Sequence, residues 1–361
     1  MHQPFSPAAP RLLLLDSLRG MSALVVLFHH ACTLFPASVA RLGQSSEGLA
    51  ALAAFVSRRN TEAVLLFFVL SGFSIRFSIE PDELAAAGSV QRYLWRRARC
   101  ILPPYLFALA VSGLLAQTVA PVPAVTTSVS TLIGNLLFLQ TPIGVPGQWF
   151  LPYAGNAPLW SLSFEVFFYL TYPLLVLGVA DPRRRLLCVF AVAACGQLVC
   201  ALAPHPFAMF CAAGPIWYFG VELAQLQLRG RAGMPVPAFF VLFLALGLAR
   251  ASSYGLQVHG LWTGAGLFLA GGLLIRHARR LRGIHEQLRA PLLEPLARIG
   301  AISYPLYLLH VPILRACVAT LGDGASAIAI GVSASLAVAV LAEHWLGAAI
   351  WRSPRRQYAA A

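Results

Sequence analysis

The stretch LLLLDSLRGMSALVVLFHH at residues 12–30 places four ionisable side chains inside an otherwise largely apolar run. A helix rising about 1.5 Å per residue needs about 20 such residues to cross about 30 Å of hydrocarbon. Each ionisable group costs about 2.5 to 3.5 kcal/mol inside a bilayer and therefore needs a partner or a function. The stretch predicts a membrane-spanning helix that carries part of a functional site.

Arg19 and His30 lie eleven positions apart in this stretch. At about 100° per residue they fall within about 20° of one helix face and about 16 Å apart along the axis. Asp16, three residues before Arg19, can neutralise its charge. Two structural alternatives stay open, a buried ion pair that only orients the helix and a histidine that only packs.

The remaining composition repeats this apolar pattern. Of 361 residues, 58% are hydrophobic and 11% charged, and the mean hydropathy is +0.74. About half the residues of a soluble domain are apolar, so we predict an all-α, polytopic membrane helix bundle in a single domain over residues 1–361. The expected transmembrane helices, about ten in number, cover 12–35, 62–79, 101–119, 159–180, 185–203, 207–228, 236–252, 259–276, 298–319 and 325–347.

The net charge of +13 comes entirely from arginine, because the sequence has no lysine. Most arginines cluster between apolar runs and fall on one side of this threading, as basic residues do on the cytoplasmic side of a membrane. Both termini are therefore expected in the cytoplasm, and no nucleic-acid partner is predicted. The main clusters lie at 92–99, 183–185, 229–231, 276–282 and 352–356.

Two further segments are expected at the membrane surface. The apolar piece 132–139 would invert every later loop if it crossed, so the segment near 130–140 is predicted to be re-entrant or interfacial. Residues 89–100 combine arginines with Tyr93 and Trp95, which suits an amphipathic helix at the cytoplasmic interface.

Polar residues recur at membrane depth in three other segments. Glu165 in PLWSLSFEVFFYLTYP matches the expected depth of His30 and can orient its imidazole. His310 lies in SYPLYLLHVPI, and FFVLSGFSIR contains Ser71 and Arg76. Helix packing and helix–helix hydrogen bonds are the alternative explanation for the serines and tyrosines.

The sequence thus predicts three groups of site residues and no metal ligands. The expected catalytic residues are His30, Arg19 and Glu165. Arginine suits bidentate phosphate binding, so donor-binding residues are expected at Arg92, Arg96, Arg97 and Arg99, although these arginines can also be only topology markers. The expected substrate contacts are Asp16, Ser71, Arg76, Tyr169, Tyr304 and His310.

In this order, the segments resemble the acyltransferase 3 family of bacterial membrane acyltransferases. The matching pieces are the pair Arg19 and His30, then FFVLSGF, WRRARCILPPY, LWSLSFEVFFYL and GAISYPLYLLHVPI. The resemblance implies a ten-helix enzyme of the bacterial cytoplasmic (inner) membrane that moves an acyl group, usually acetyl from acetyl-CoA, onto an extracytoplasmic carbohydrate or lipid-linked sugar. Acetyl-CoA is then a co-substrate, and no tightly bound cofactor is expected.

The chain departs from the family pattern at two positions. Cys100 stands where relatives often have arginine, and Leu65 replaces a frequent acidic residue. These departures concern donor binding. The main rival prediction is a secondary transporter or flippase, because polar residues at membrane depth also line solute pathways.

Overall fold

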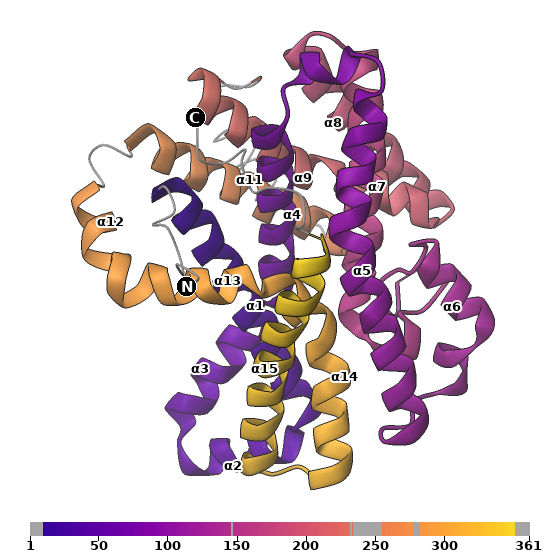
Figure 1. The fold of residues 1–361 in the computed structure, drawn as a ribbon, viewed down its shortest axis with the longest axis vertical. Coiled ribbons are helices and arrows are strands. Elements are labelled where there is room, and N and C mark those ends of the chain that lie inside the picture. Colours follow the sequence, from indigo (N-terminus) through magenta and orange to yellow (C-terminus); the bar gives the residue numbers. More distant parts are fainter. Residues whose placement is uncertain (1–9, 146, 232, 234–254, 278–281, 351–361) are drawn as a thin grey trace.

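The chain folds into helices connected by short turns (Figure 1). The structure is a computed structural model that describes residues 10–145, 147–231, 233, 255–277 and 282–350. These residues contain no strand, and a single isolated bridge joins Gln140 to Phe150. The long helices are α1 (Pro10–Leu34), α4 (Asn60–Ser78), α5 (Ser89–Thr118), α7 (Trp160–Gly178), α8 (Pro182–Leu202), α9 (Pro206–Arg229), α11 (Gly255–His277), α14 (Ser303–Leu321) and α15 (Ala325–Ile350).

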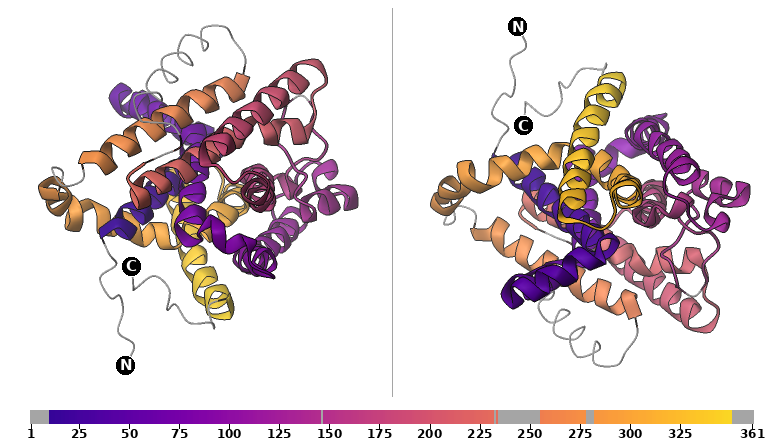
Figure 2. Two further views of the ribbon diagram at one scale, coloured as in Figure 1. Left: turned by 90° about the horizontal axis from the view of Figure 1, so that it is seen from above. Right: turned by 90° about the horizontal axis from the view of Figure 1, so that it is seen from below.

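Shorter helices fill the connections between these long ones. They are α2 (Pro36–Ser45), α3 (Glu47–Ser57), η1 (Pro81–Ala85), η2 (Ala124–Thr127), α6 (Val129–Leu136), η3 (Tyr153–Gly155), η4 (Ala157–Leu159), α12 (Arg282–Leu288), the π-helical turn η6 (Arg289–Leu293) and α13 (Glu294–Ala301). The end-on views place α12 at one edge of the molecule and α6 toward the opposite edge (Figure 2).

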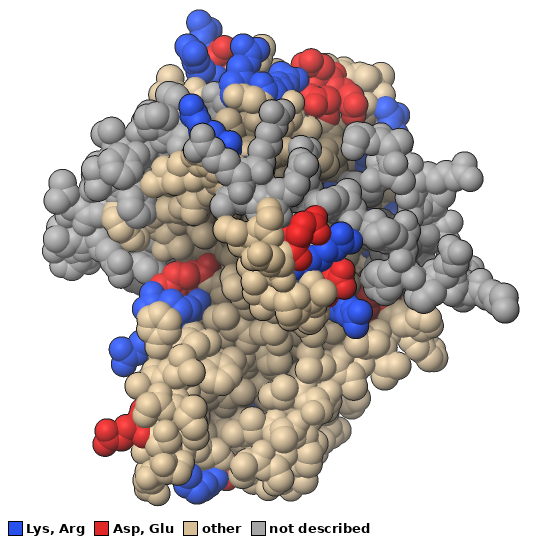
Figure 3. Space-filling view, turned by 90° about the vertical axis from the view of Figure 1, so that its left-hand side faces the viewer, with Lys and Arg blue, Asp and Glu red and all other residues tan. Residues whose placement is uncertain are grey.

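The described helices form a polytopic bundle. Seven spans are long and apolar enough to cross a membrane, and an eighth results if α1 and α2, bent by 94°, count as one. On the face in Figure 3, a broad uncharged surface lies between the charged groups of the upper half and the few charged groups at the lower edge, as lipid contact requires. The predicted fold class is confirmed.

Each expected span within the described residues overlaps a long helix, and the range 236–252 lies outside them. The helix α11 covers the expected range 259–276 but is not among the seven spans found within the described residues. The helix α6 has 8 residues and extends about 12 Å. It is too short to cross, as predicted for that segment.

Two predicted boundaries were wrong. The expected helix 298–319 is divided at Ile302, where α13 ends and α14 begins. Pro305 then lies in the first turn of α14, where its missing N–H is tolerated. Residues 89–100 are not a separate interfacial helix but the start of α5, whose 30 residues exceed the length that the hydrocarbon requires by about one half.

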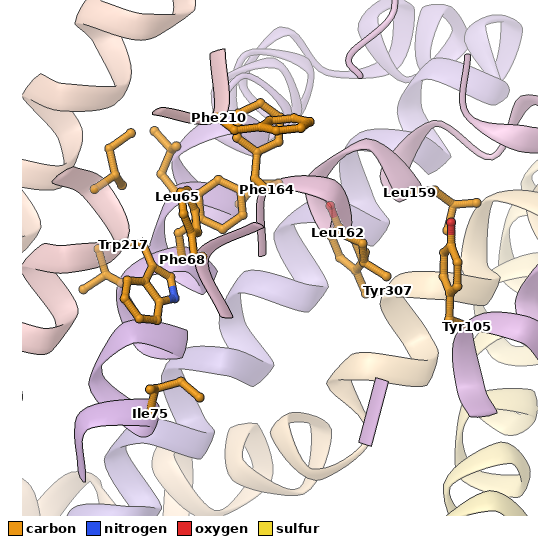
Figure 4. Close-up of a cluster of buried hydrophobic side chains, with 14 of the residues drawn as sticks. Leu65, Phe68, Ile75, Tyr105, Leu159, Leu162, Phe164, Phe210, Trp217 and Tyr307 are labelled. Atoms are coloured by element: carbon orange, nitrogen blue, oxygen red, sulfur yellow. The ribbon is translucent and has the colours of Figure 1, made fainter. Parts of the chain in front are cut away.

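The core lies where α4, α7 and α9 meet (Figure 4). The ring of Phe164 lies 6.0 Å from that of Phe68 and 4.7 Å from that of Phe210. A Cβ atom on Gly72 of α4 would collide with the carbonyl oxygen of Trp217 on α9, so the two backbones touch. This close approach fixes the face of α4 that carries Ser71 and Ser74.

A second close contact joins α1 to α13. A Cβ atom on Gly20 would collide with the carbonyl oxygen of Leu296, and one on Gly300 would collide with that of Asp16. Small residues allow such approach between membrane helices. The contact holds the Asp16–Arg19 part of α1 in a fixed place.

The connection between α1 and α4 contains the helices α2 and α3. Asp323, in the turn between α14 and α15, accepts hydrogen bonds from the N–H groups of Ala37 at 2.6 Å and Ser38 at 3.0 Å. Burial raises the pKa of Asp323, but these hydrogen bonds, the Ser38 hydroxyl and the charge of Arg41 outweigh it and hold the pKa below its usual range. The carboxylate thereby links α2 to the turn between α14 and α15.

Buried amides fasten the 120–158 segment onto the bundle. Asn156 donates through Nδ2 to the Leu308 carbonyl oxygen at 2.8 Å, and Gln140 donates through Nε2 to the Leu159 carbonyl oxygen at 2.8 Å. Tyr105 of α5 donates its hydroxyl to the carbonyl oxygen of Asn135 at 2.9 Å. The 120–158 segment is therefore anchored to both α5 and α14.

Candidate active site

Arg19 is held between α1 and α4. Its Nη1 donates to Asp16 Oδ1 at 2.8 Å, and its Nη2 donates to Ser74 Oγ at 2.6 Å. Asp16 precedes Arg19, so the guanidinium points toward the N-terminal end of α1 and away from His30. The side chains of Arg19 and Asp16 are 30% and 36% exposed. The ion pair is confirmed, and its guanidinium stays accessible to a ligand.

His30 contacts a second histidine across the bundle. Its Nδ1 lies 3.1 Å from Nε2 of His310 on α14 and 2.9 Å from the carbonyl oxygen of Val26. Nδ1 of His310 lies 2.9 Å from the carbonyl oxygen of Leu306, and the His310 side chain is buried. Both imidazoles thus point into the protein.

These contacts define the proton positions when both rings are neutral. A carbonyl oxygen only accepts, so His310 donates from Nδ1 to Leu306 and keeps an acceptor lone pair at Nε2. Nδ1 of His30 then faces two acceptors, Val26 O and His310 Nε2, and carries the hydrogen. Nε2 of His30 holds the free lone pair, and it makes no hydrogen bond to any residue that the structure describes.

His29 extends the row of imidazoles. Its ring lies 4.9 Å from that of His30, which lies 4.9 Å from that of His310. Nδ1 of His29 lies 3.0 Å from both the carbonyl and hydroxyl oxygens of Ser57. His29 is thereby attached to α3 instead of the bundle interior.

Glu165 ends a chain of hydrogen bonds. Tyr169 donates its hydroxyl to Glu165 Oε1 in a short contact, and Ser71 Oγ lies 2.8 Å from the Tyr169 hydroxyl. Trp217 Nε1 donates to Ser71 Oγ at 3.1 Å. Each group in this chain donates its hydrogen bond in the direction of the carboxylate. Such an arrangement strengthens every hydrogen bond in the chain.

The expected orientation of His30 by Glu165 was wrong. The hydrogen-bond partners of His30 in the described chain are Val26 and His310, whereas the Glu165 carboxylate faces Tyr169. Tyr169 lies four residues after Glu165 on α7 and so competes for it on the same helix face.

Tyr304 and Tyr307 of α14 add polar groups near Glu165 and near the pair His30 and His310. Ser161 Oγ lies 2.8 Å from the Tyr307 hydroxyl, and the Tyr304 hydroxyl donates to the carbonyl oxygen of Ile101 at 3.1 Å. Glu165 interacts electrostatically with both tyrosines. We call this set of polar side chains the polar track. Its members are Arg19, Ser71, Ser74, Tyr169, Glu165, Tyr304, Tyr307, Ser161, His310 and His30.

Arg76, an expected substrate contact, is buried in ion pairs. It is 1% exposed, and its Nη2 lies 3.1 Å from Glu80 Oε2. Arg229 of α9 approaches the same oxygen at 2.8 Å. Arg76 therefore lies at the arginine-rich end of the bundle, two residues beyond Ser74 of the polar track.

The expected donor-binding arginines lie on the first turns of α5. Arg92 and Arg96 are exposed, and Arg97 and Arg99 are half-buried. Arg92 donates to Ser89 Oγ at 2.7 Å, and the Arg97 guanidinium lies 5.9 Å from the ring of Tyr93. Arg97 also interacts electrostatically with Tyr169, so this cluster approaches one end of the polar track.

The sequence reasoning missed three contacts of the site. Ser74 was not named, although it lies three residues after Ser71 and so shares its face of α4. Trp217 gave no signal in the sequence, since indoles are common in membrane helices. His310 was named, but nothing in the sequence paired it with His30.

Comparison with known proteins identifies what this arrangement is similar to. The chain matches the family described as an acyltransferase domain over residues 13–344. It is also 27% identical over 331 residues to acyltransferase MdmB of Streptomyces mycarofaciens, which covers 85% of this chain and 80% of that protein. No solved structure matches the chain.

Proposed function

Because the chain belongs to the acyltransferase 3 family and is therefore an acyl-transferring membrane enzyme, we propose that it acetylates a carbohydrate. The proposed donor is acetyl-CoA, and the acceptor is a hydroxyl of an exopolysaccharide, O-antigen unit or lipid-linked sugar outside the bacterial cytoplasmic membrane. Family membership supports acyl transfer, and the site chemistry supports a hydroxyl acceptor, which needs a base to become a nucleophile.

The observation that carries the proposal is the pair His30 and His310. The hydrogen bonds at Nδ1 leave a lone pair on Nε2 of His30. A neutral imidazole held in one orientation is a suitable general base. The hydroxyls of Ser161, Tyr307 and Tyr169, the last of which interacts with Arg97, are the proposed contacts of a donor that enters from the arginine-rich end.

His30 takes the proton of the acceptor hydroxyl while that oxygen attacks the thioester carbonyl carbon. The carbon–sulfur bond then breaks, and the imidazolium returns its proton to the departing thiolate, so the products are the sugar ester and free coenzyme A. In a two-step variant His30 itself carries the acetyl group before the sugar accepts it. His30 is the central residue in both routes.

The other residues receive supporting roles. Arg19 and Ser74 hold a part of the donor that is remote from the reacting carbonyl. Arg19 points away from His30, which lies about 16 Å farther along α1. The arginines Arg92, Arg96, Arg97 and Arg99 hold its phosphates. Glu165, oriented by Tyr169, accepts hydrogen bonds from donor amides or sugar hydroxyls.

The proposal is tested with the purified chain in sealed vesicles that contain a lipid-linked sugar. Acetyl-CoA is expected to yield free thiol and an equal amount of sugar acetate, detected by a thiol reagent and mass spectrometry. A transporter or flippase would move sugar across the bilayer without releasing thiol, which would refute the acetyltransferase proposal. Cellular glycans compared with and without the gene identify the acceptor.

His310 is expected to act through His30. Replacing it with phenylalanine keeps an aromatic ring but removes the acceptor at Nε2, so kcat should fall about tenfold while KM for acetyl-CoA stays constant. His310→Gln restores an acceptor oxygen and should recover part of kcat. Unchanged kcat in a folded His310→Phe variant, or no recovery by glutamine, would remove His310 from this role.

A further inference from the structure

Four buried hydrogen-bond donors lie at the arginine-rich end of the bundle without a partner among the described residues. They are Arg76 Nε on α4, the Tyr93 hydroxyl and Arg97 Nε on α5, and the Tyr172 hydroxyl on α7. The side chains of Arg76, Tyr93 and Tyr172 are at most 3% exposed. Buried polar groups without a hydrogen bond are rare in proteins because they lose their hydration without compensation.

These donors belong to one cluster. The Tyr93 and Tyr172 rings lie 6.5 Å apart, and the Arg97 guanidinium lies 5.9 Å from the Tyr93 ring. Tyr172 also interacts electrostatically with Arg76. The side chains that carry these donors therefore come from three helices, of which α5 and α7 both contact the turn η1.

The charge of the cluster is unbalanced. Among the described residues, four arginines (Arg76, Arg97, Arg185 and Arg229) interact with this cluster, whereas three glutamates do so: Glu80, Glu222 and, through Tyr169 beside Arg97, Glu165. A water molecule can satisfy a hydroxyl, but it leaves this excess charge uncompensated. An anion with several acceptor oxygens satisfies both the donors and the charge.

We infer that Arg76, Tyr93, Arg97 and Tyr172 form a binding site for a phosphate group. The site lies next to the polar track, since Arg97 also interacts with Tyr169. If the proposed function is right, the phosphate belongs to coenzyme A; an anionic lipid headgroup is the other source of the same chemistry. The exposed arginines Arg92 and Arg96 lie on the surface, and the two tyrosine hydroxyls continue this donor-binding region into the interior.

The test uses Tyr93→Phe, Tyr172→Phe and the double variant of the full chain in detergent. Each change removes one hydroxyl and keeps the ring, so thermal stability without ligand should stay equal or rise, as expected when an unpaired buried group is removed. The affinity for coenzyme A, measured by calorimetry, should fall about tenfold per hydroxyl. For the lipid alternative, the thermal stability of each variant is compared between nanodiscs of phosphatidylglycerol and nanodiscs of phosphatidylcholine.

Tyr105→Phe is the matched control. Its hydroxyl is also buried, but it donates to Asn135 O and accepts from Gln140 Nε2. This variant should lose thermal stability and bind coenzyme A normally. The contrast separates a ligand-binding hydroxyl from one that supports the fold.

The outcomes distinguish the possibilities. Weaker coenzyme A binding assigns the site to the donor, and loss of phosphatidylglycerol-specific stabilisation alone assigns it to a lipid phosphate. The inference fails if both ligands bind normally, or if the phenylalanine variants lose stability as Tyr105→Phe does. Normal acetyl transfer in variants with unchanged binding would refute this site and leave the proposed function standing.

Discussion

Replacing His30 with alanine is expected to lower the rate of acetyl transfer about a thousandfold. General bases of this kind contribute about 100-fold to 10,000-fold, and His30 is the central residue of both proposed routes. His310 is not expected to take over, because it is buried and its Nε2 lies behind the position of the His30 ring, one imidazole farther from the acceptor hydroxyl. The measurement is the rate of thiol release by the purified variant in vesicles, at saturating acetyl-CoA.

His29→Ala is the control for this result. It removes a neighbouring imidazole from the same helix, but one that is bound to Ser57 on α3. Its rate should stay within a few fold of the original. If His30→Ala reached the membrane at normal levels and still acetylated the glycan, the catalytic assignment of His30 would be lost.

The helices were predictable because lipid imposes a simple rule on the sequence. Every backbone group must be satisfied inside its own segment, so long apolar runs become helices. The errors concern places where this rule is silent. Nothing in residues 298–319 marks the break at Ile302 except Pro305, which a helix tolerates in its first turn.

The site was predictable within helices but not between them. The shared face of Arg19 and His30 follows from helix geometry, as does the ion pair of Arg19 with Asp16. The contact of His30 with His310 joins residues 280 positions apart. The expected depth in the membrane fitted Glu165 as a partner of His30 as well as it fitted His310. The spacing of Glu165 and Tyr169 was a local signal that could have shown where that carboxylate points.

Arg19→Gln should lower kcat/KM for acetyl-CoA about 100-fold, the size of effect expected when the hydrogen bonds of one charged group to a ligand are lost. The guanidinium has five N–H donors, and the structure shows one bond each to Asp16 and Ser74. The remaining donors can hold the donor substrate, so the loss should be mainly in KM. Initial rates across acetyl-CoA concentrations separate KM from kcat.

Asp16 complicates this experiment because glutamine at position 19 leaves its carboxylate without an ion-pair partner. The double variant Arg19→Gln, Asp16→Asn removes that charge as well, and Asp16→Asn alone keeps the guanidinium. If Arg19 binds the donor, the double variant stays about as defective as Arg19→Gln, and Asp16→Asn loses only a few fold. If the pair merely orients α1, the double variant should recover nearly full activity, because neither charge is then unpaired. That recovery would contradict a role in binding, since the cost of breaking the pair would have explained the whole loss.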